Sequence, residues 1–207
     1  MSILGSTAVF TVSAHDDDSY MLGDATFRPV VKSHFHEWRF GVGGVPHVAT
    51  CGGCGRKTNP SYISPSFRVR RRDADLVATY DGYLLGSQRL RNHCVENLSP
   101  GARFVPLPGD DGFYWLRPDR IVEFDPVARQ TKFERLCPDC GAFYSVAGAT
   151  PARLKVDPAS VPDGFFRTDL EFGSGPEQSP LIVVAGRTSA LLRNGRFRGL
   201  SLTAIAA

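Results

Sequence analysis

Short apolar or alternating segments separated by turns dominate the pattern of hydrophobic and polar positions along this chain. Residues 7–12, 76–80 and 113–116 are typical of strands, since they are apolar or alternating over four to six positions. Proline is largely confined to edge strands, so Pro106 predicts a sheet edge for its own segment. Further strands are predicted at 33–40, 67–70, 103–107, 121–124, 132–136, 142–146, 181–184 and 199–205.

Two segments have helical periodicity instead. Ser87 is expected to cap a helix that extends to residue 98, because Leu90, Cys94 and Leu98 fall on one face at a spacing of four. Thr188 is expected to cap a second, shorter helix. Each predicted helix lies between two predicted strands. The pattern therefore predicts a β-rich α+β fold that contains two similar β-α-β units.

The length of 207 residues and the hydrophobic content of 42% allow one compact domain, 1–207, with possible sub-units 1–130 and 131–207. No segment approaches the roughly 18 apolar residues of a membrane span, and the first residues lack the pattern of a signal peptide. We therefore expect a cytoplasmic protein without a membrane partner. The net charge of +3 is mildly basic and only weakly favours a nucleic-acid partner.

Two short cysteine knuckles, 51–55 and 137–141, are the most specific motifs. Each is a Cys-x-x-Cys-Gly sequence, and the ligands that they predict are Cys51, Cys54, Cys137 and Cys140. Four thiolates suffice for a tetrahedral Zn²⁺ site, and each pair has the spacing of zinc ligands. The glycine that ends each motif can adopt a positive φ, which lets the chain turn back at the tip of a hairpin.

The 82 residues between Cys54 and Cys137 far exceed the roughly 15–20 residues of an ordinary zinc ribbon. One shared ion would therefore join distant parts of the fold in a ribbon-like site. Two separate redox pairs are an alternative, although neither pair is followed by the helical pattern of a thioredoxin-type site. A third alternative is a chain that has lost its metal. A catalytic zinc is not expected, because four cysteines leave no position for water.

Three histidines and the fifth cysteine are weaker candidates, since each also has an ordinary structural explanation. His34 and His36 alternate on a predicted strand with His47 farther along, and they suggest either a second metal or a general base, or simply a strand face. Cys94 follows His93, but neighbours on a helix point about 100° apart, so they do not form a dyad. We expect Cys94 to lie in the core.

Two charged groups of residues are candidates for partner contacts. The basic residues that could contact phosphates are Arg56, Lys57, Arg68, Arg70, Arg71 and Arg72. The acidic loops comprise Asp16, Asp17, Asp18, Asp110 and Asp111, and they could contact a basic protein surface. Both groups could equally be solvated turns and strand ends. The chain has no phosphate-binding glycine loop, nucleophile elbow or HExxH motif, so we do not expect an enzyme.

The two distant CxxCG motifs resemble those of the bacterial double-CxxCG motif proteins. The resemblance covers roughly residues 45–205 and is specific only at the cysteines and glycines; the first 40 residues lie outside it. Other matching positions are 104–107, Tyr114, 122–125, 165–169, Phe172, Gly173, 181–184, Leu191, Leu192, Gly199 and Leu200. That family includes immunity proteins, which neutralise a toxin delivered between neighbouring cells. The resemblance carries over only the four cysteines.

The resemblance implies a non-catalytic immunity protein that binds a cognate toxin, with the acidic loops as candidate contacts. The alternative is a zinc-ribbon nucleic-acid-binding or transcription-associated module that uses the basic residues. A hydrolase or transferase with a site near His34 and His36 is the third hypothesis.

Overall fold

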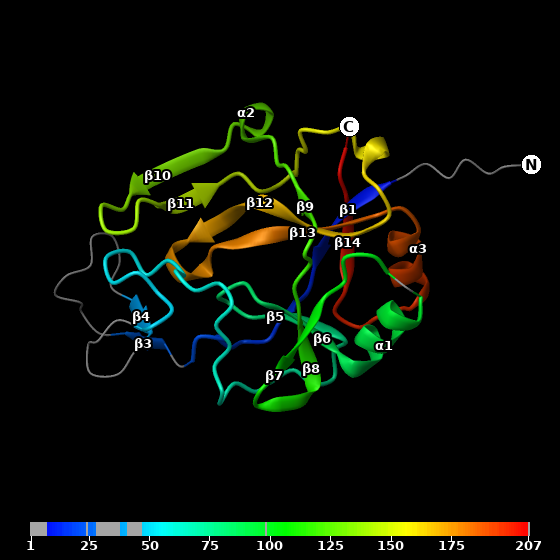
Figure 1. Ribbon diagram of the computed structural model, residues 1–207, viewed down its shortest axis with the longest axis horizontal. Helices are drawn as coiled ribbons and strands as arrows, with labels where there is room; N and C mark the ends of the chain where they lie inside the picture. The colour runs from blue at the N-terminus through cyan, green and yellow to red at the C-terminus, as the bar shows by residue number, and fades with distance from the viewer. Residues whose placement is uncertain (1–7, 24, 28–37, 41–46, 98, 207) are drawn as a thin grey trace, which may run out of the picture.

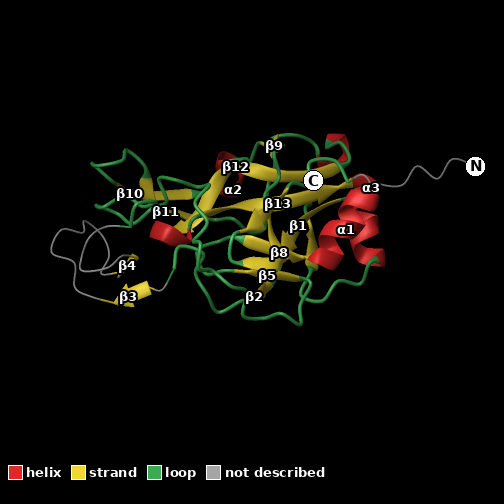
Figure 2. Ribbon diagram, turned by 60° about the horizontal axis from the view of Figure 1, so that its bottom comes forward, coloured by secondary structure: helices red, strands yellow, loops and turns green. Residues whose placement is uncertain are grey.

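Two β-sheets packed face to face form most of the computed structural model (Figure 1), which describes residues 8–23, 25–27, 38–40, 47–97 and 99–206. Helices α1 (Gln88–Glu96) and α3 (Gly186–Asn194) lie together at one end of the sheets (Figure 2). No helix in these ranges has the length and apolar character that a bilayer span requires. The predicted β-rich α+β class is confirmed. The shorter helical turns are α2 (Pro126–Arg129), η1 (Pro158–Ser160) and η2 (Gly175–Glu177).

The larger sheet is mostly antiparallel and has β12 and β13 at its centre. On the side of β12 that faces away from β13, the strand pairs first with β9, in parallel, and then with β11, antiparallel. In spatial order its strands are β10 (Lys132–Leu136), β11 (Phe143–Ala147), β12 (Gly164–Ser174), β13 (Ser179–Ala185), β1 (Val9–Ser13) and β14 (Ser201–Ala204), with β9 (Ile121–Val122) beside β12.

The smaller sheet continues directly from β1, because the chain passes from β1 into β2 with one residue between them. β7 forms one edge, which confirms the edge position predicted from Pro106. In order, its strands are β2 (His15–Asp16), β5 (Leu76–Ala78), β6 (Leu84–Ser87), β8 (Asp110–Leu116) and β7 (Phe104–Leu107). A separate ribbon consists of β3 (Ala25–Phe27) and β4 (Trp38–Phe40).

The larger sheet is buried on both faces, because successive side chains of a strand point to opposite sides. In β12, Phe166 belongs to an outer core with Phe124 and Val183, whereas Phe165 belongs to the core between the sheets. That central core also takes in both helices and strands β5, β6 and β8 of the smaller sheet. A third core covers the far face of the smaller sheet. β12 is therefore a doubly buried strand.

Each of the two longer helices connects two strands that flank a third strand. α1 connects β6 to β7 on either side of β8, and α3 connects β13 to β14 on either side of β1. In both cases the middle strand is antiparallel to its neighbours. The similarity of the two units stays a prediction. A division of the chain at residue 130 would separate β1 and β9 from the strands with which they pair.

The structure corrects parts of the predicted pattern. Ser87 caps α1 as predicted, by accepting a hydrogen bond from the Leu90 amide. Thr188 is not the cap of α3, which begins at Gly186. Residues 67–70 form no strand, whereas β12 was not predicted. Leu98 and residues 33–37 lie outside the described residues.

Leu191 and Leu192 on α3 provide a matched test of the central core. Leu192 is buried between the sheets and helices, whereas its neighbour Leu191 is only half-buried. We expect Leu192→Ala to lower the free energy of unfolding by about 2–5 kcal/mol, as core truncations do. Leu191→Ala should cost clearly less. Chemical denaturation of both variants measures the difference, and equal losses would contradict this core assignment.

Candidate metal centre

The two CxxCG segments fold into the same hydrogen-bonded turn. The carbonyl of Cys51 accepts from the Gly55 amide at 2.8 Å, and the amide of Cys51 donates to the carbonyl of Arg56. In the second segment the carbonyl of Cys137 accepts from the Gly141 amide at 2.9 Å, and the amide of Cys137 donates to the carbonyl of Ala142 at 2.9 Å. Both glycines have a positive φ, +75° and +68°, as the motif predicted. Each turn therefore presents its two sulfurs from one side of a short hairpin.

These turns bring the four predicted cysteine ligands into one cluster. All four Sγ atoms lie within 4.8 Å of one another. The Sγ atoms of Cys51 and Cys137 are 3.9 Å apart, and those of Cys54 and Cys140 are 3.6 Å apart. A Zn–S bond of about 2.3 Å places tetrahedral ligands roughly 3.8 Å apart, whereas a disulfide requires about 2.05 Å. The cluster thus has the dimensions of a tetrahedral metal site, and none of its cysteines forms a disulfide.

Burial and local hydrogen bonds act in opposite directions on these thiols. Burial is the main cause that raises the pKa of Cys54 and of Cys140. Burial also acts to raise the pKa of Cys51, but the backbone amides of Cys54 and Gly53 hold it below its ordinary value. Amide donors of this kind stabilise a thiolate, which is the form that binds a metal. The first knuckle therefore supplies part of the support that a metal–thiolate site needs.

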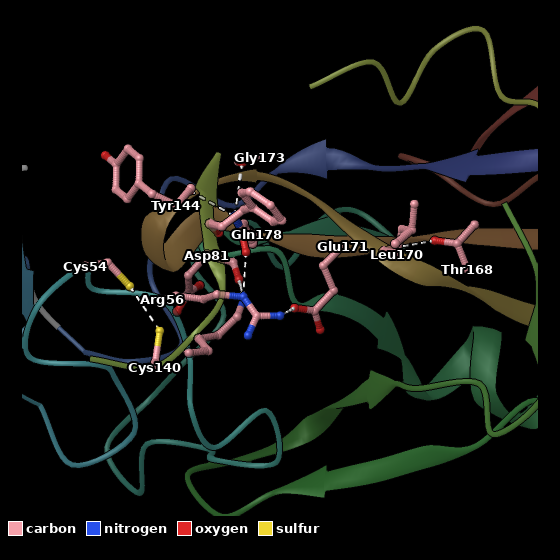
Figure 3. Close-up of polar contacts among 12 residues, drawn as sticks. Cys54, Arg56, Asp81, Cys140, Tyr144, Thr168, Leu170, Glu171, Gly173 and Gln178 are labelled. Atoms are coloured by element: carbon pink, nitrogen blue, oxygen red, sulfur yellow. Dashed lines mark hydrogen bonds and ion pairs between the residues drawn. The ribbon is translucent and has the colours of Figure 1, made fainter. Parts of the chain in front are cut away.

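A buried glutamine joins the flanks of the two knuckles (Figure 3). Gln178 is 1% exposed, and its amide nitrogen donates to the carbonyls of Phe143 and Tyr144, both at 2.9 Å. Its amide oxygen accepts from Nε of Arg56 at 2.6 Å. Arg56 also pairs with Glu171 at 2.9 Å. These contacts hold β11, the strand after the second knuckle, against Arg56, the residue after the first knuckle.

Sequence reasoning did not identify Gln178 as part of this site. Gln178 is the single residue between η2 and β13, and the carbonyls that it contacts lie 34 and 35 positions earlier in the chain. Arg56 was assigned to a basic surface, whereas its guanidinium is paired next to the cysteines.

The acidic residues divide into structural and exposed groups. Asp17 is buried and accepts from the amides of Arg70 and Arg71 at 2.9 and 2.7 Å. Asp110 is also buried, in β8, and accepts from the Val69 amide. The prediction of hydrated acidic loops is therefore wrong for Asp17 and Asp110, whose carboxylates are not available to a partner. Asp16, Asp18 and Asp111 are exposed, and a partner contact by them stays a prediction.

The predicted basic patch pairs with the predicted acidic loops. Arg70 donates to the carbonyl of Asp18, and Arg71 forms an ion pair with the carboxylate of Asp18 at 3.6 Å. Arg72 pairs with Asp110 at 2.5 Å. The basic residues and the acidic loops, which the sequence predicts to contact different partners, thus largely neutralise each other.

The other candidates occupy structural positions or lie outside the described residues. His34 and His36 are in the latter group. The His47 ring packs edge-on against Tyr62, with centroids 4.7 Å apart, and burial lowers the pKa of this histidine. Cys94 is buried in the central core, as predicted, and burial raises its pKa to about 12. A thiol in this state is a poor nucleophile at neutral pH.

Asp110 and Asp111 give a matched test of the acidic residues. Burial acts to raise the pKa of Asp110, but bonds from Arg72 and from the amides of Gly112 and Val69 hold it below the ordinary value. A lowered folded-state pKa adds stability above the unfolded-state pKa, and this stability is lost as the pH falls through the folded-state pKa.

We expect Asp110→Asn to reduce the free energy of unfolding at pH 7 by about 1.5–3 kcal/mol, the scale of hydrogen bonds to charged groups. The variant should also lose part of the acid dependence below about pH 4. Asp111→Asn should change little, because that side chain is exposed. Urea titrations over the acid range test this, and equal behaviour of the two variants would argue against a structural role for Asp110.

No protein-family model matches this chain, and no match is found among curated proteins. The four-cysteine cluster in the structure indicates a metal ion on geometric grounds alone.

Proposed function

We propose that this protein is a non-catalytic binding protein stabilised by one Zn²⁺ ion, and that it acts in the cytoplasm as an immunity protein against a cognate bacterial toxin. The observation that carries the proposal is the convergence of both CxxCG motifs on one four-sulfur cluster. The same two motifs carry the resemblance to the double-CxxCG proteins. Four sulfur ligands fill a tetrahedral site, so the ion would be structural.

Zinc is favoured by the ligand set. A tetrahedral set of four thiolates suits zinc or iron, and zinc is the usual ion of structural Cys₄ sites. The ion would join two hairpins that start 86 residues apart, in the manner of a zinc ribbon. It would thereby fix the turn between β10 and β11 to the loop before β5.

The β10–β11 hairpin supports a protein partner. All five residues of β10 are exposed, and β10 forms the outer edge of the larger sheet. Phe133 and Leu136 are 39% and 57% exposed, and the ring of Phe133 packs at 5.3 Å on that of Phe143, also 39% exposed. Clustered apolar side chains on an exposed edge are typical of interaction surfaces. Because Cys137 and Cys140 lie in the turn of this hairpin, a bound ion would also set its shape.

The nucleic-acid alternative finds less support. Arg70, Arg71 and Arg72 are engaged by Asp18 and Asp110, and Lys57 is buried. These cations are therefore largely compensated within the protein, whereas phosphate binding requires cations that are open to the ligand.

Metal analysis tests the zinc proposal. We expect about one zinc per chain after purification under reducing conditions, and Cys51→Ser or Cys137→Ser should lose it. Removal by a strong chelator should lower the melting temperature markedly, because structural zinc is worth about 10–16 kcal/mol in small domains.

Cys94→Ala is the matched control and should keep the metal, since Cys94 lies in the core. Iron in place of zinc would correct the identity of the ion. A chain that binds no metal, or melts unchanged after its removal, would contradict the proposal.

Rescue of growth tests the immunity proposal. Toxin candidates, taken from the genes that neighbour this one, are each expressed in a bacterial host with and without this protein, and we expect survival from the cognate toxin only with it. The double substitution Phe133→Ser and Leu136→Ser should weaken the complex at least about 30-fold, as loss of central apolar contacts does.

Val127→Ser is the control, because Val127 is equally apolar and 84% exposed but lies on α2. Absence of protection by the unaltered protein would refute the immunity function. Full protection by the double variant would place the interface elsewhere.

A further inference from the structure

A cavity of about 130 Å³ lies between the two sheets and beside the first knuckle. The larger sheet contributes side chains of β12 and β13, and the smaller sheet contributes β6 and β8. Apolar walls come from Leu84, Leu116 and Ile182, with Pro60 and Pro118 also in the lining. None of the four cysteines lines this space. The cavity is therefore separate from the four sulfurs, although Gln178 and Glu171, which join the flanks of the knuckles, also line it.

One charged group of this lining is almost fully buried. Lys57 is 8% exposed, and its ammonium group donates to the carbonyl of Asp81 and lies 5.0 Å from the centre of the Tyr83 ring. An ammonium group has three N–H donors. Within the described part of the chain the structure shows one acceptor for them. The carboxylates of Asp81, Glu171 and Glu177 lie near enough to favour the charged form of Lys57, and an oxygen acceptor in the cavity could take up the N–H donors that remain.

Arg167 adds a second cation to the same cavity. It lies on the face of β12 that carries Phe165, toward the smaller sheet. The structure shows no hydrogen bond or ion pair of its guanidinium with the residues that it describes. The other charged side chains of the lining are already engaged: Arg117 donates to Ser61 at 2.8 Å, and Glu171 pairs with Arg56.

We propose that this cavity binds a small monocarboxylate with a flat apolar body, about the size of benzoate, whose carboxylate is held by Arg167 and Lys57. The proposal does not rest on the immunity function, and none of the four cysteines lines the cavity. Ligand sites are commonly apolar clefts with a few convergent polar groups, which describes this lining.

The size and charge of the cavity narrow the ligand class. An apolar cavity of about 150 Å³ accepts benzene, so about 130 Å³ fits a single ring or a short branched chain. Guanidinium groups match the geometry of a carboxylate. The carboxylate of Glu171 lies in the same lining and would repel a doubly charged anion.

Benzoate is the probe for the test, with benzamide as its neutral analogue of the same shape and benzylammonium as the opposite charge. Titration of the full chain, followed by amide NMR and calorimetry, should show saturable binding of benzoate. We expect the largest shifts at the amides of Lys57, Ser179 and Ile182, which line the cavity. Benzamide should bind at least about tenfold more weakly, and benzylammonium should not bind.

Arg167→Gln should weaken benzoate binding about tenfold or more, because a charge-assisted bond is lost, and Arg167→Lys should restore part of it. Arg187→Gln on α3 is the control, because that arginine does not line the cavity. Melting curves of each variant establish that it is folded.

Three results would overturn the proposal. The first is no shift with benzoate up to about 10 mM, a concentration at which a ligand of this size in a matched site should bind. The second is equal binding of benzoate and benzamide. The third is a set of shifts in the unaltered protein that maps away from the cavity, a result that does not depend on any variant folding.

Discussion

The convergence of four sulfur atoms on one point is the constraint on which much of this structure depends. Four thiolates within 4.8 Å of one another would repel strongly in a partly buried site, so they need either protons or a central cation. The hairpin turns bring the sulfurs together in pairs, and the clamp formed by Gln178 and Arg56 holds the flanks of the two pairs together. The protein therefore fixes the approximate ligand geometry through ordinary hydrogen bonds, and an ion would complete it.

The charged loops show how pairing within the protein neutralises charged surfaces that the sequence predicts. Each acidic cluster contains one residue that turns inward, Asp17 or Asp110, and binds backbone amides of residues 69–71. The arginines that follow those amides then pair with Asp18 or Asp110. Within residues 67–70, the amides of Val69 and Arg70 thus donate to the carboxylates of Asp110 and Asp17 instead of to a neighbouring strand.

Sequence reasoning succeeded where the determining contacts are local and failed where they are distant. The cap of α1 and the turns of both knuckles depend on residues a few positions apart, and both were predicted. The start of α3 depends on Asp163, whose carboxylate accepts from the amide and the hydroxyl of Thr188 at 2.8 and 2.7 Å, 25 positions away. The strand β12 carries no simple alternation, because Phe165 and Phe166 enter different cores. That both motifs belong to one cluster was inferred from ligand chemistry, whereas the part played by Gln178 could not be inferred.

The two residues that follow the first knuckle connect the metal centre to the interior of the protein. Arg56 turns toward Gln178 and Glu171, while Lys57, the next residue, pairs in a short bridge with Thr50 and reaches the carbonyl of Asp81. Successive side chains of an extended chain point to opposite sides. Arg56 therefore contacts Gln178 and Glu171, whereas Lys57 extends toward the cavity. Lys57 can stay buried there because the knuckle fixes its backbone and Asp81 supplies an acceptor. Whatever holds the four sulfurs together therefore also determines where this buried ammonium group lies.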